Sequence, residues 1–236
     1  MDNLFGGRNR FSMKALTNFS QLSDQARRHL KNVYGTLSLS LLSALAGAVL
    51  YFISSIAGQF LGVIGSFASL IWLMATPYNE KNQPKRLGIM CTFGLFSGMT
   101  LGPALDFAIA VDPSIVPTAF LSTAVIFTSF TLVALWTQRR SLLYLGGSLL
   151  AGLNLLLLAG FINLFLGSYF ILQFQLYFGL MVFCVFVMYD TQLIVEKFEH
   201  GDKDYIWHSV ELFIDFIAIF RRLLIILASK EKKSKK

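Results

Sequence analysis

Four long stretches of the chain carry no charged residue, and they constrain the fold more than any other feature. They are residues 32–79, 87–105, 113–138 and 141–189, with 48, 19, 26 and 49 residues respectively. A membrane-spanning helix needs roughly 20 apolar residues. The two longest stretches therefore each hold two spans and a turn, and the other two hold one each. Six spans follow, with a weaker seventh segment after them.

Composition agrees with this interpretation. The 236 residues are 55% hydrophobic and only 14% charged, whereas soluble domains are about 25% charged. We predict an all-α polytopic membrane protein with a single transmembrane bundle over residues 32–228. A cytosolic amphipathic lead-in over 1–31 and a basic cytosolic tail over 229–236 flank the bundle. The predicted spans are residues 32–52, 56–76, 87–107, 115–136, 141–162, 169–190 and 206–228.

The basic residues predict the orientation. Lys and Arg cluster before the first predicted span and after the second, fourth and sixth, and the loops near Ser54, Asp112 and Gly167 contain none. Basic loops stay in the cytosol, so the N-terminus is expected there. The net charge of +7 then reports orientation, and we expect no nucleic-acid partner. A complete seventh crossing would place the basic tail on the far side. The last segment therefore either crosses against this rule or dips in and returns.

Small residues and prolines mark packing sites and a break. Stretches such as "SALAGAV" and "GLFSGMTLG" let helices approach closely, so we interpret them as helix contacts. Pro103 is expected to kink or end the third helix. Asp106 and Asp112 are expected at the far membrane face.

Three carboxylates lie in or beside apolar segments and need an explanation. Asp190 ends the longest uncharged stretch, and Glu211 and Asp215 lie in "VELFIDFIAIFRRLL", residues 210–224. Glu211 and Asp215 are four residues apart and share a helix face. Ionisable groups inside a membrane usually face a bundle interior or a water-filled cavity. Asp190 of the sixth helix and Asp215 of the seventh are therefore expected to meet, with Glu211 nearer the interface.

A carboxyl pair couples proton binding to cation binding. Two carboxyls in contact tend to share a proton, which makes a closed latch. Losing that proton leaves two charges that repel or that hold a hard cation such as calcium. Raising the pH should weaken the latch, and Asp190 and Asp215 become the candidate ligands of a transient calcium ion.

Two other interpretations use the same residues. Asp190 and Asp215 could lie near opposite interfaces and be solvated. An intramembrane aspartyl protease would explain Tyr189–Asp190, but no glycine precedes Asp215 to admit a substrate backbone. We therefore expect no enzyme. Cys91 and Cys184 are expected as buried free thiols, and no cofactor is expected.

Several motifs resemble the Bax inhibitor-1 family, also described as transmembrane Bax inhibitor motif-containing proteins, and its vertebrate members in particular. They are "IWLMATP" (71–77), "LGPALDF" (101–107), "YDTQLIVEK" (189–197) and "HGDKDYIWHSVELFIDFIAIFRRLL" (200–224). The resemblance covers nearly the whole chain. It implies six helices around a central seventh and an aspartate latch at Asp190 and Asp215. It also implies residence in the endoplasmic reticulum membrane and suppression of cell death.

The resemblance implies further residues and partners. A bacterial relative's latch includes an arginine on its second span. That span has no basic residue here, so Lys85 and Arg86 of the following loop are candidates, with Glu211 and Asp106 as further accessory residues. Bcl-family proteins and an unfolded-protein-response sensor kinase are implied partners, besides the lipid bilayer; self-association into a homo-oligomer is left open. The tail lysines implied in regulation are Lys230, Lys232, Lys233, Lys235 and Lys236.

Two functions remain in play. One is a pH-sensitive calcium leak from the reticulum, gated by the carboxyl pair, that dampens stress-induced death and unfolded-protein signalling. The other is a non-conducting membrane protein that regulates Bax, Bcl-family proteins and stress sensors, with indirect effects on calcium.

Overall fold

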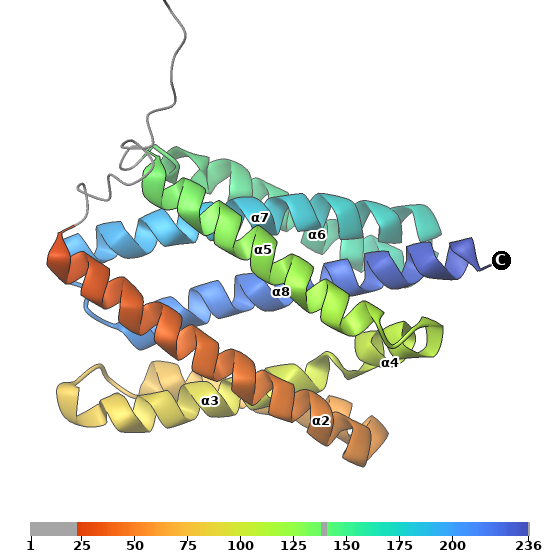
Figure 1. Cartoon of the computed structure of the whole chain (residues 1–236), viewed down its shortest axis with the longest axis horizontal. Helices are drawn as coiled ribbons and strands as arrows, with labels where there is room; N and C mark the ends of the chain where they lie inside the picture. Colours follow the sequence, from red (N-terminus) through yellow and green to blue (C-terminus); the bar gives the residue numbers. More distant parts are fainter. Residues whose placement is uncertain (1–22, 138–140, 236) are drawn as a thin grey trace, which may run out of the picture.

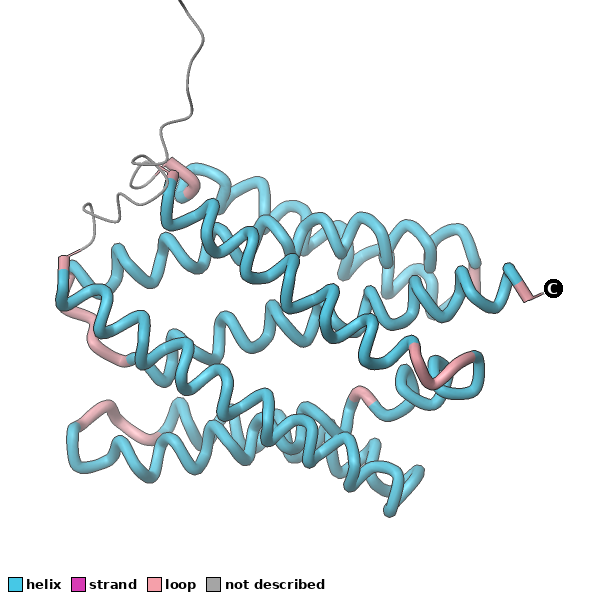
Figure 2. The backbone as a smooth tube through the Cα atoms, viewed as in Figure 1, coloured by secondary structure: helices cyan, strands magenta, loops and turns pink. Residues whose placement is uncertain are grey.

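A computed structural model describes residues 23–137 and 141–235, which form helices joined by short loops (Figures 1 and 2). No strand occurs within these residues. The helices are α2 (Asp24–Ala75), η2 (Glu80–Asn82), α3 (Gln83–Thr100), α4 (Gly102–Val111), α5 (Ile115–Trp136), η3 (Leu143–Leu145), α6 (Gly146–Leu166), α7 (Tyr169–Glu199) and α8 (Tyr205–Ser234).

Five of the described segments are long and apolar enough to cross a membrane, and a bent helix pair makes a sixth. They include two arms of α2, Asp24–Ile53 and Gly58–Ala75, which Figure 1 shows running in opposite directions. The predicted class, an all-α polytopic membrane protein, is confirmed. The predicted number of seven is not, because α8 is too polar to count as a span by composition.

Most of the predicted lead-in, residues 1–22, lies outside the described residues. The remainder does not form a separate helix, because α2 already begins at Asp24. The Ser23 side chain starts it by accepting a hydrogen bond from the backbone N–H of Ala26 at 3.1 Å. Ala26 and Leu30 are buried in the bundle, so this first part of α2 belongs to the core.

Small residues join α2 to α3, as predicted. A Cβ atom at Gly98 would lie 1.9 Å from the carbonyl oxygen of Ala44, and one at Gly47 would lie 1.8 Å from that of Leu95. The two backbones therefore touch directly, which only glycine at these positions allows.

The expected break at Pro103 is also present. Helix α3 ends at Thr100, and α4 begins at Gly102 with the proline in its first turn. The two helices are bent by 46°. Proline suits this place because it lacks the N–H that a first turn leaves unpaired.

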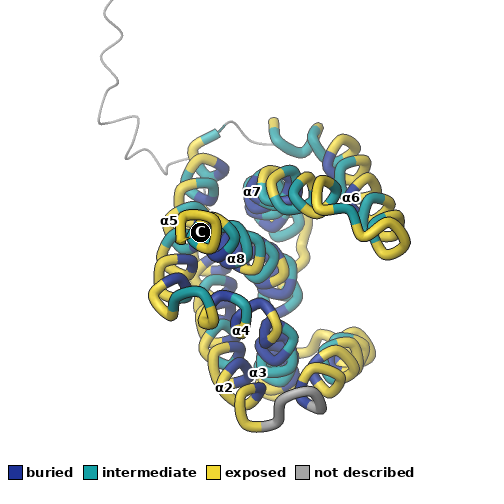
Figure 3. The backbone as a smooth tube through the Cα atoms, turned by 90° about the vertical axis from the view of Figure 1, so that its right-hand side faces the viewer, coloured by how far each residue is buried: buried dark blue, intermediate teal, exposed yellow. Residues whose placement is uncertain are grey.

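Helix α8 occupies the centre of the bundle (Figure 3). It contacts α2, α3, α4, α5 and α7, whereas α6 packs on α7. Its residues Leu212, Ile219 and Leu224 are fully buried. The helix has 30 residues, about 45 Å, and is continuous. A continuous helix does not turn back on itself. The structure therefore differs from the alternative in which the last segment dips in and returns.

The two ends of the described chain lie at opposite ends of the bundle (Figure 1). The start of α2 lies beside the α7–α8 loop, while the end of α8 reaches the α4–α5 loop, where Lys235 forms an ion pair with Asp112. The sequence placed both flanking segments in the cytosol. In the structure the start of α2 and the end of α8 lie at opposite ends of the bundle, so a shared cytosolic location of the two flanking segments stays a prediction.

Candidate functional site

The side chains of Asp190 on α7 and Asp215 on α8 lie within hydrogen-bond reach of each other. A hydrogen bond between two carboxyl groups requires a proton on one of them. Asp215 is 3% exposed, and its Oδ2 has no hydrogen-bond partner among the described residues. The structure thus brings the two predicted gate residues together inside the bundle, and places neither in solvent at an interface.

The seam between α7 and α8 explains why these residues meet. On α7, Phe183, Asp190 and Lys197 recur every seven residues and so share one face. All three contact α8. Apolar neighbours such as Val187 and Ile194 of α7 are fully buried beside them, which excludes lipid from this face.

Glu211 is paired one helical turn before Asp215. Its Oε1 lies 2.6 Å from Nζ of Lys197, and both side chains are partly exposed. Its other oxygen, Oε2, has no partner among the residues described. Glu211 is therefore close to the carboxyl pair, as expected of an accessory residue, but Lys197 neutralises its charge.

Arg222 lies two turns beyond Asp215 on α8, and the sequence analysis did not single it out. Its guanidinium is 4.4 Å from the ring centroid of Phe183, and its Nη1 donates a hydrogen bond to the carbonyl oxygen of Ala218 at 3.0 Å. The sequence did contain a signal for Arg222. It is a basic residue in an apolar helix, seven residues after Asp215.

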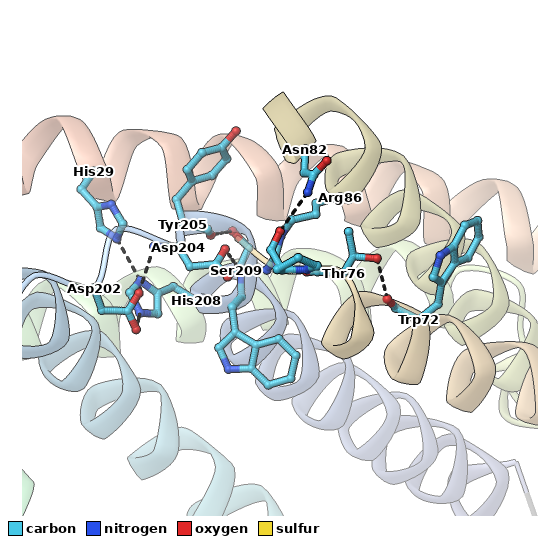
Figure 4. A network of polar contacts seen from close by, with 12 residues as sticks. His29, Trp72, Thr76, Asn82, Arg86, Asp202, Asp204, Tyr205, His208 and Ser209 are labelled. Carbon is cyan, nitrogen blue, oxygen red and sulfur yellow. Dashed lines mark hydrogen bonds and ion pairs between the residues drawn. The ribbon is translucent and has the colours of Figure 1, made fainter. Parts of the chain in front are cut away.

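A second polar network closes the bundle where α8 begins (Figure 4). Arg86 is 3% exposed and donates to the carbonyl oxygen of Thr76 and to Oδ2 of Asp204. Asp204 also caps α8, since its Oδ1 accepts from the N–H of Trp207 at 3.1 Å. This ion pair ties α3 to the first turn of α8.

Two histidines complete the network. Nε2 of His29 on α2 lies 2.9 Å from Nδ1 of His208 on α8. The other ring nitrogen of His208 is 3.5 Å from Oδ2 of Asp202. The His29 ring also stacks on Phe198 of α7, with centroids 4.5 Å apart. Sequence analysis missed this contact, because the two histidines are far apart in the chain.

The residues considered as substitutes for the latch arginine, or as accessories to the latch, do not lie at the carboxyl pair. Arg86 belongs to the closing network, and Nζ of Lys85 lies 6.0 Å from the ring centroid of Trp72. Asp106 is exposed on α4 and accepts a hydrogen bond from the hydroxyl of Tyr51 at 2.7 Å. None of these three residues has a contact with Asp190 or Asp215 among the described interactions, so the structure does not bring any of them to the carboxyl pair.

The tail residues gather around the opposite end of the bundle. Lys235 pairs with Asp112 at 3.2 Å, Lys232 lies over the ring of Phe107, and Lys233 lies over that of Tyr169. Hydrogen bonds from Ser114, and then Lys235, lower the pKa of Asp112 to about 2. Lys230 is exposed, and Lys236 is outside the described residues. The last turn of α8 is thereby fixed to the α4–α5 loop.

Within the described residues, no three His, Cys, Asp or Glu side chains converge as a metal site. Cys91 is half-buried and Cys184 is buried, and neither forms a disulfide.

The chain is similar in sequence to a group of known proteins. A family model described as inhibitor of apoptosis-promoting Bax1 matches residues 26–232. The chain is 50% identical to the human protein named Bax inhibitor 1 over 228 residues, 96% of each chain. It is 48% identical to a probable Bax inhibitor 1 of Paralichthys olivaceus over 94% of each. Identity to Bax inhibitor 1 of Arabidopsis thaliana is 43%, covering 94% of this chain and 89% of the other.

Proposed function

Because the chain belongs to the Bax inhibitor-1 family, an anti-apoptotic family of multi-pass membrane proteins, we propose that it acts through a proton-controlled cation leak. The Asp190–Asp215 pair is the gate, and calcium is the cation. The proposed location is the endoplasmic reticulum membrane with a cytosolic N-terminus. Release of stored calcium through this leak would reduce stress-induced cell death and unfolded-protein signalling.

One observation carries the proposal: two carboxyl groups lie within hydrogen-bond reach of each other inside an apolar bundle. With one shared proton the pair carries a single negative charge, and the proton between the two carboxyl groups holds α7 to α8. When the proton leaves, two negative charges face each other and either separate or bind a cation. Calcium prefers six to eight oxygen ligands, so water or backbone oxygens would complete its shell. Flux should therefore rise as the pH rises.

The test is calcium flux into liposomes that contain the purified chain, followed from about pH 6 to 8. The wild type is compared with Asp190→Asn, Asp215→Asn and Asp24→Asn at matched incorporation. Asp24 is the matched control, because its side chain is 89% exposed at the start of α2. We expect pH-dependent flux from the wild type and the control, and a loss of pH dependence in the other two. Flux no higher than in protein-free liposomes would refute the proposal.

A second candidate is a non-conducting protein that binds Bcl-family proteins and a stress-sensor kinase. The exposure of Lys230, Lys232 and Lys233 on the last turns of α8 favours it. Removal of residues 230–236 should then abolish protection of cells from Bax while the liposome flux stays unchanged. Loss of both together would favour the leak.

A further inference from the structure

Charges follow a fixed order along the seam between α7 and α8. The Lys197–Glu211 ion pair comes first, the Asp190–Asp215 carboxyl pair follows, and Arg222 comes next. The carboxyl pair therefore has one cationic side chain on each side along the seam. Of these two cations, only Lys197 has a carboxylate partner among the described residues. Arg222 keeps its charge without such a partner.

The surroundings of Arg222 hold it in the seam. Its guanidinium rests on the face of Phe183, which attracts a cation through the ring quadrupole. A Cβ atom at Gly179 would lie only 2.4 Å from its Nε, so glycine leaves the space that the guanidinium occupies. Arginine inside a membrane is costly and usually faces a bundle interior. Here it faces α7, the helix that supplies Asp190.

The neighbouring arginine is placed differently. Arg221 is exposed, whereas Arg222 is partly buried between the two helices. Seven residues separate Arg222 from Asp215, which corresponds to about 10 Å along the helix. A divalent cation at the carboxyl pair is therefore close enough to Arg222 for repulsion even in a water-like dielectric.

We infer that Arg222 is an electrostatic barrier that limits cation passage on the C-terminal side of the carboxyl pair. This inference rests on the proposed leak and adds a residue that sets its rate. A cation that leaves Asp190 and Asp215 along the seam toward the end of α8 must pass the guanidinium. Phe183 and Gly179 are positioning residues, because they hold that group in place.

The experiment compares calcium flux at one pH for wild type, Arg222→Gln, Arg222→Lys and Arg221→Gln in liposomes. Arg221→Gln removes the same charge from the adjacent, exposed position. We expect Arg222→Gln to raise the flux about fourfold or more, from the repulsion between a divalent ion and a unit charge about 10 Å apart. Arg222→Lys and Arg221→Gln should remain near the wild-type rate, since the first keeps the charge and the second lies outside the seam.

A second variant separates the effect of the guanidinium from a loss of folding. Gly179→Ala leaves the charge intact but forces the guanidinium out of its space, so it should also raise the flux. Size-exclusion profiles and thermal midpoints show which variants are folded. Wild-type flux from both Arg222→Gln and Gly179→Ala overturns the inference and leaves the leak standing. If no variant exceeds protein-free liposomes, the leak and the inference both fail.

Discussion

His29 and His208 are 179 residues apart in the chain, yet Nε2 of the first lies 2.9 Å from Nδ1 of the second. One imidazole must donate to the other, so only one of the facing nitrogens carries a proton. The contact joins α2, the first described helix, to α8, the central one. Because both rings are buried, it is a structural connection rather than a surface contact.

This contact can be tested by His29→Phe. The new ring can keep the stacking on Phe198 but leaves Nδ1 of His208 without its partner. We expect the free energy of unfolding to fall by about 1–3 kcal/mol, the cost of an unsatisfied buried polar group. Denaturation in detergent, followed by tryptophan fluorescence, measures it. His200→Phe is the control, with a side chain that is 66% exposed, and should change stability by about 0.5 kcal/mol or less. Equal stability of the two variants would contradict the prediction.

The Arg86–Asp204 ion pair should be the most sensitive point of the closing network. Arg86→Met removes one partner of a nearly buried pair and also leaves the carbonyl of Thr76 unpaired. Breaking such a pair from one side costs about 3–5 kcal/mol. The thermal midpoint should fall clearly, whereas Arg221→Met at an exposed position should leave it nearly unchanged. A similar midpoint for both would show that the pair contributes little.

Acid should weaken the contact between the end of α8 and the α4–α5 loop. The pKa of Asp112 is lowered from 3.8 to about 2 in the folded chain, so its contribution to stability is present above about pH 4 and disappears as the pH falls through 2. Lys235 has a raised pKa, chiefly through its hydrogen bond to Asp112, so its contribution is lost only at alkaline pH above 10.5.

The corresponding measurement is the thermal midpoint of the wild type and Asp112→Asn at pH 5 and at pH 2. The wild type should be the more stable protein at pH 5, and the difference should be much smaller at pH 2. A difference as large at pH 2 as at pH 5 would show that the carboxylate charge is not its source.

The backbone contact between α2 and α3 should not tolerate a methyl group. Gly98→Ala would push a Cβ atom against the carbonyl of Ala44, so we expect a loss of about 1–3 kcal/mol or more. Gly88 lies on the same helix with open space around it. Gly88→Ala should therefore stabilise the protein by up to about 1 kcal/mol through helix propensity. Equilibrium unfolding of both variants tests whether the two substitutions change the free energy of unfolding in opposite directions.

Sequence patterns predicted those features that depend on local composition. Uncharged stretches predicted an all-α polytopic membrane protein, and Asp190 and Asp215 were recognisable because carboxylates are rare in such stretches. The break at Pro103 followed from proline's own geometry. Each of these inferences needs only residues that are close in the chain.

Features that depend on packing between distant segments were not predictable in this way. Arg86 was considered for the carboxyl pair, yet it pairs with Asp204, which lies 118 residues further along the chain. The course of α8 was left open because a complete seventh crossing would have placed the basic tail on the far side, against the charge rule. Burial of Leu212, Ile219 and Leu224 by five other helices shows that packing determined it.

The position of α8 has a consequence for how the protein is made. Chains emerge from the ribosome in order, and earlier segments begin to fold before later ones exist. The helix that fills the middle therefore arrives after the helices that enclose it, and its composition keeps it out of the candidate spans. The earlier helices can complete their packing only when α8 is in place. A chain that stops before residue 205 would keep its apolar segments but lack the element around which they assemble.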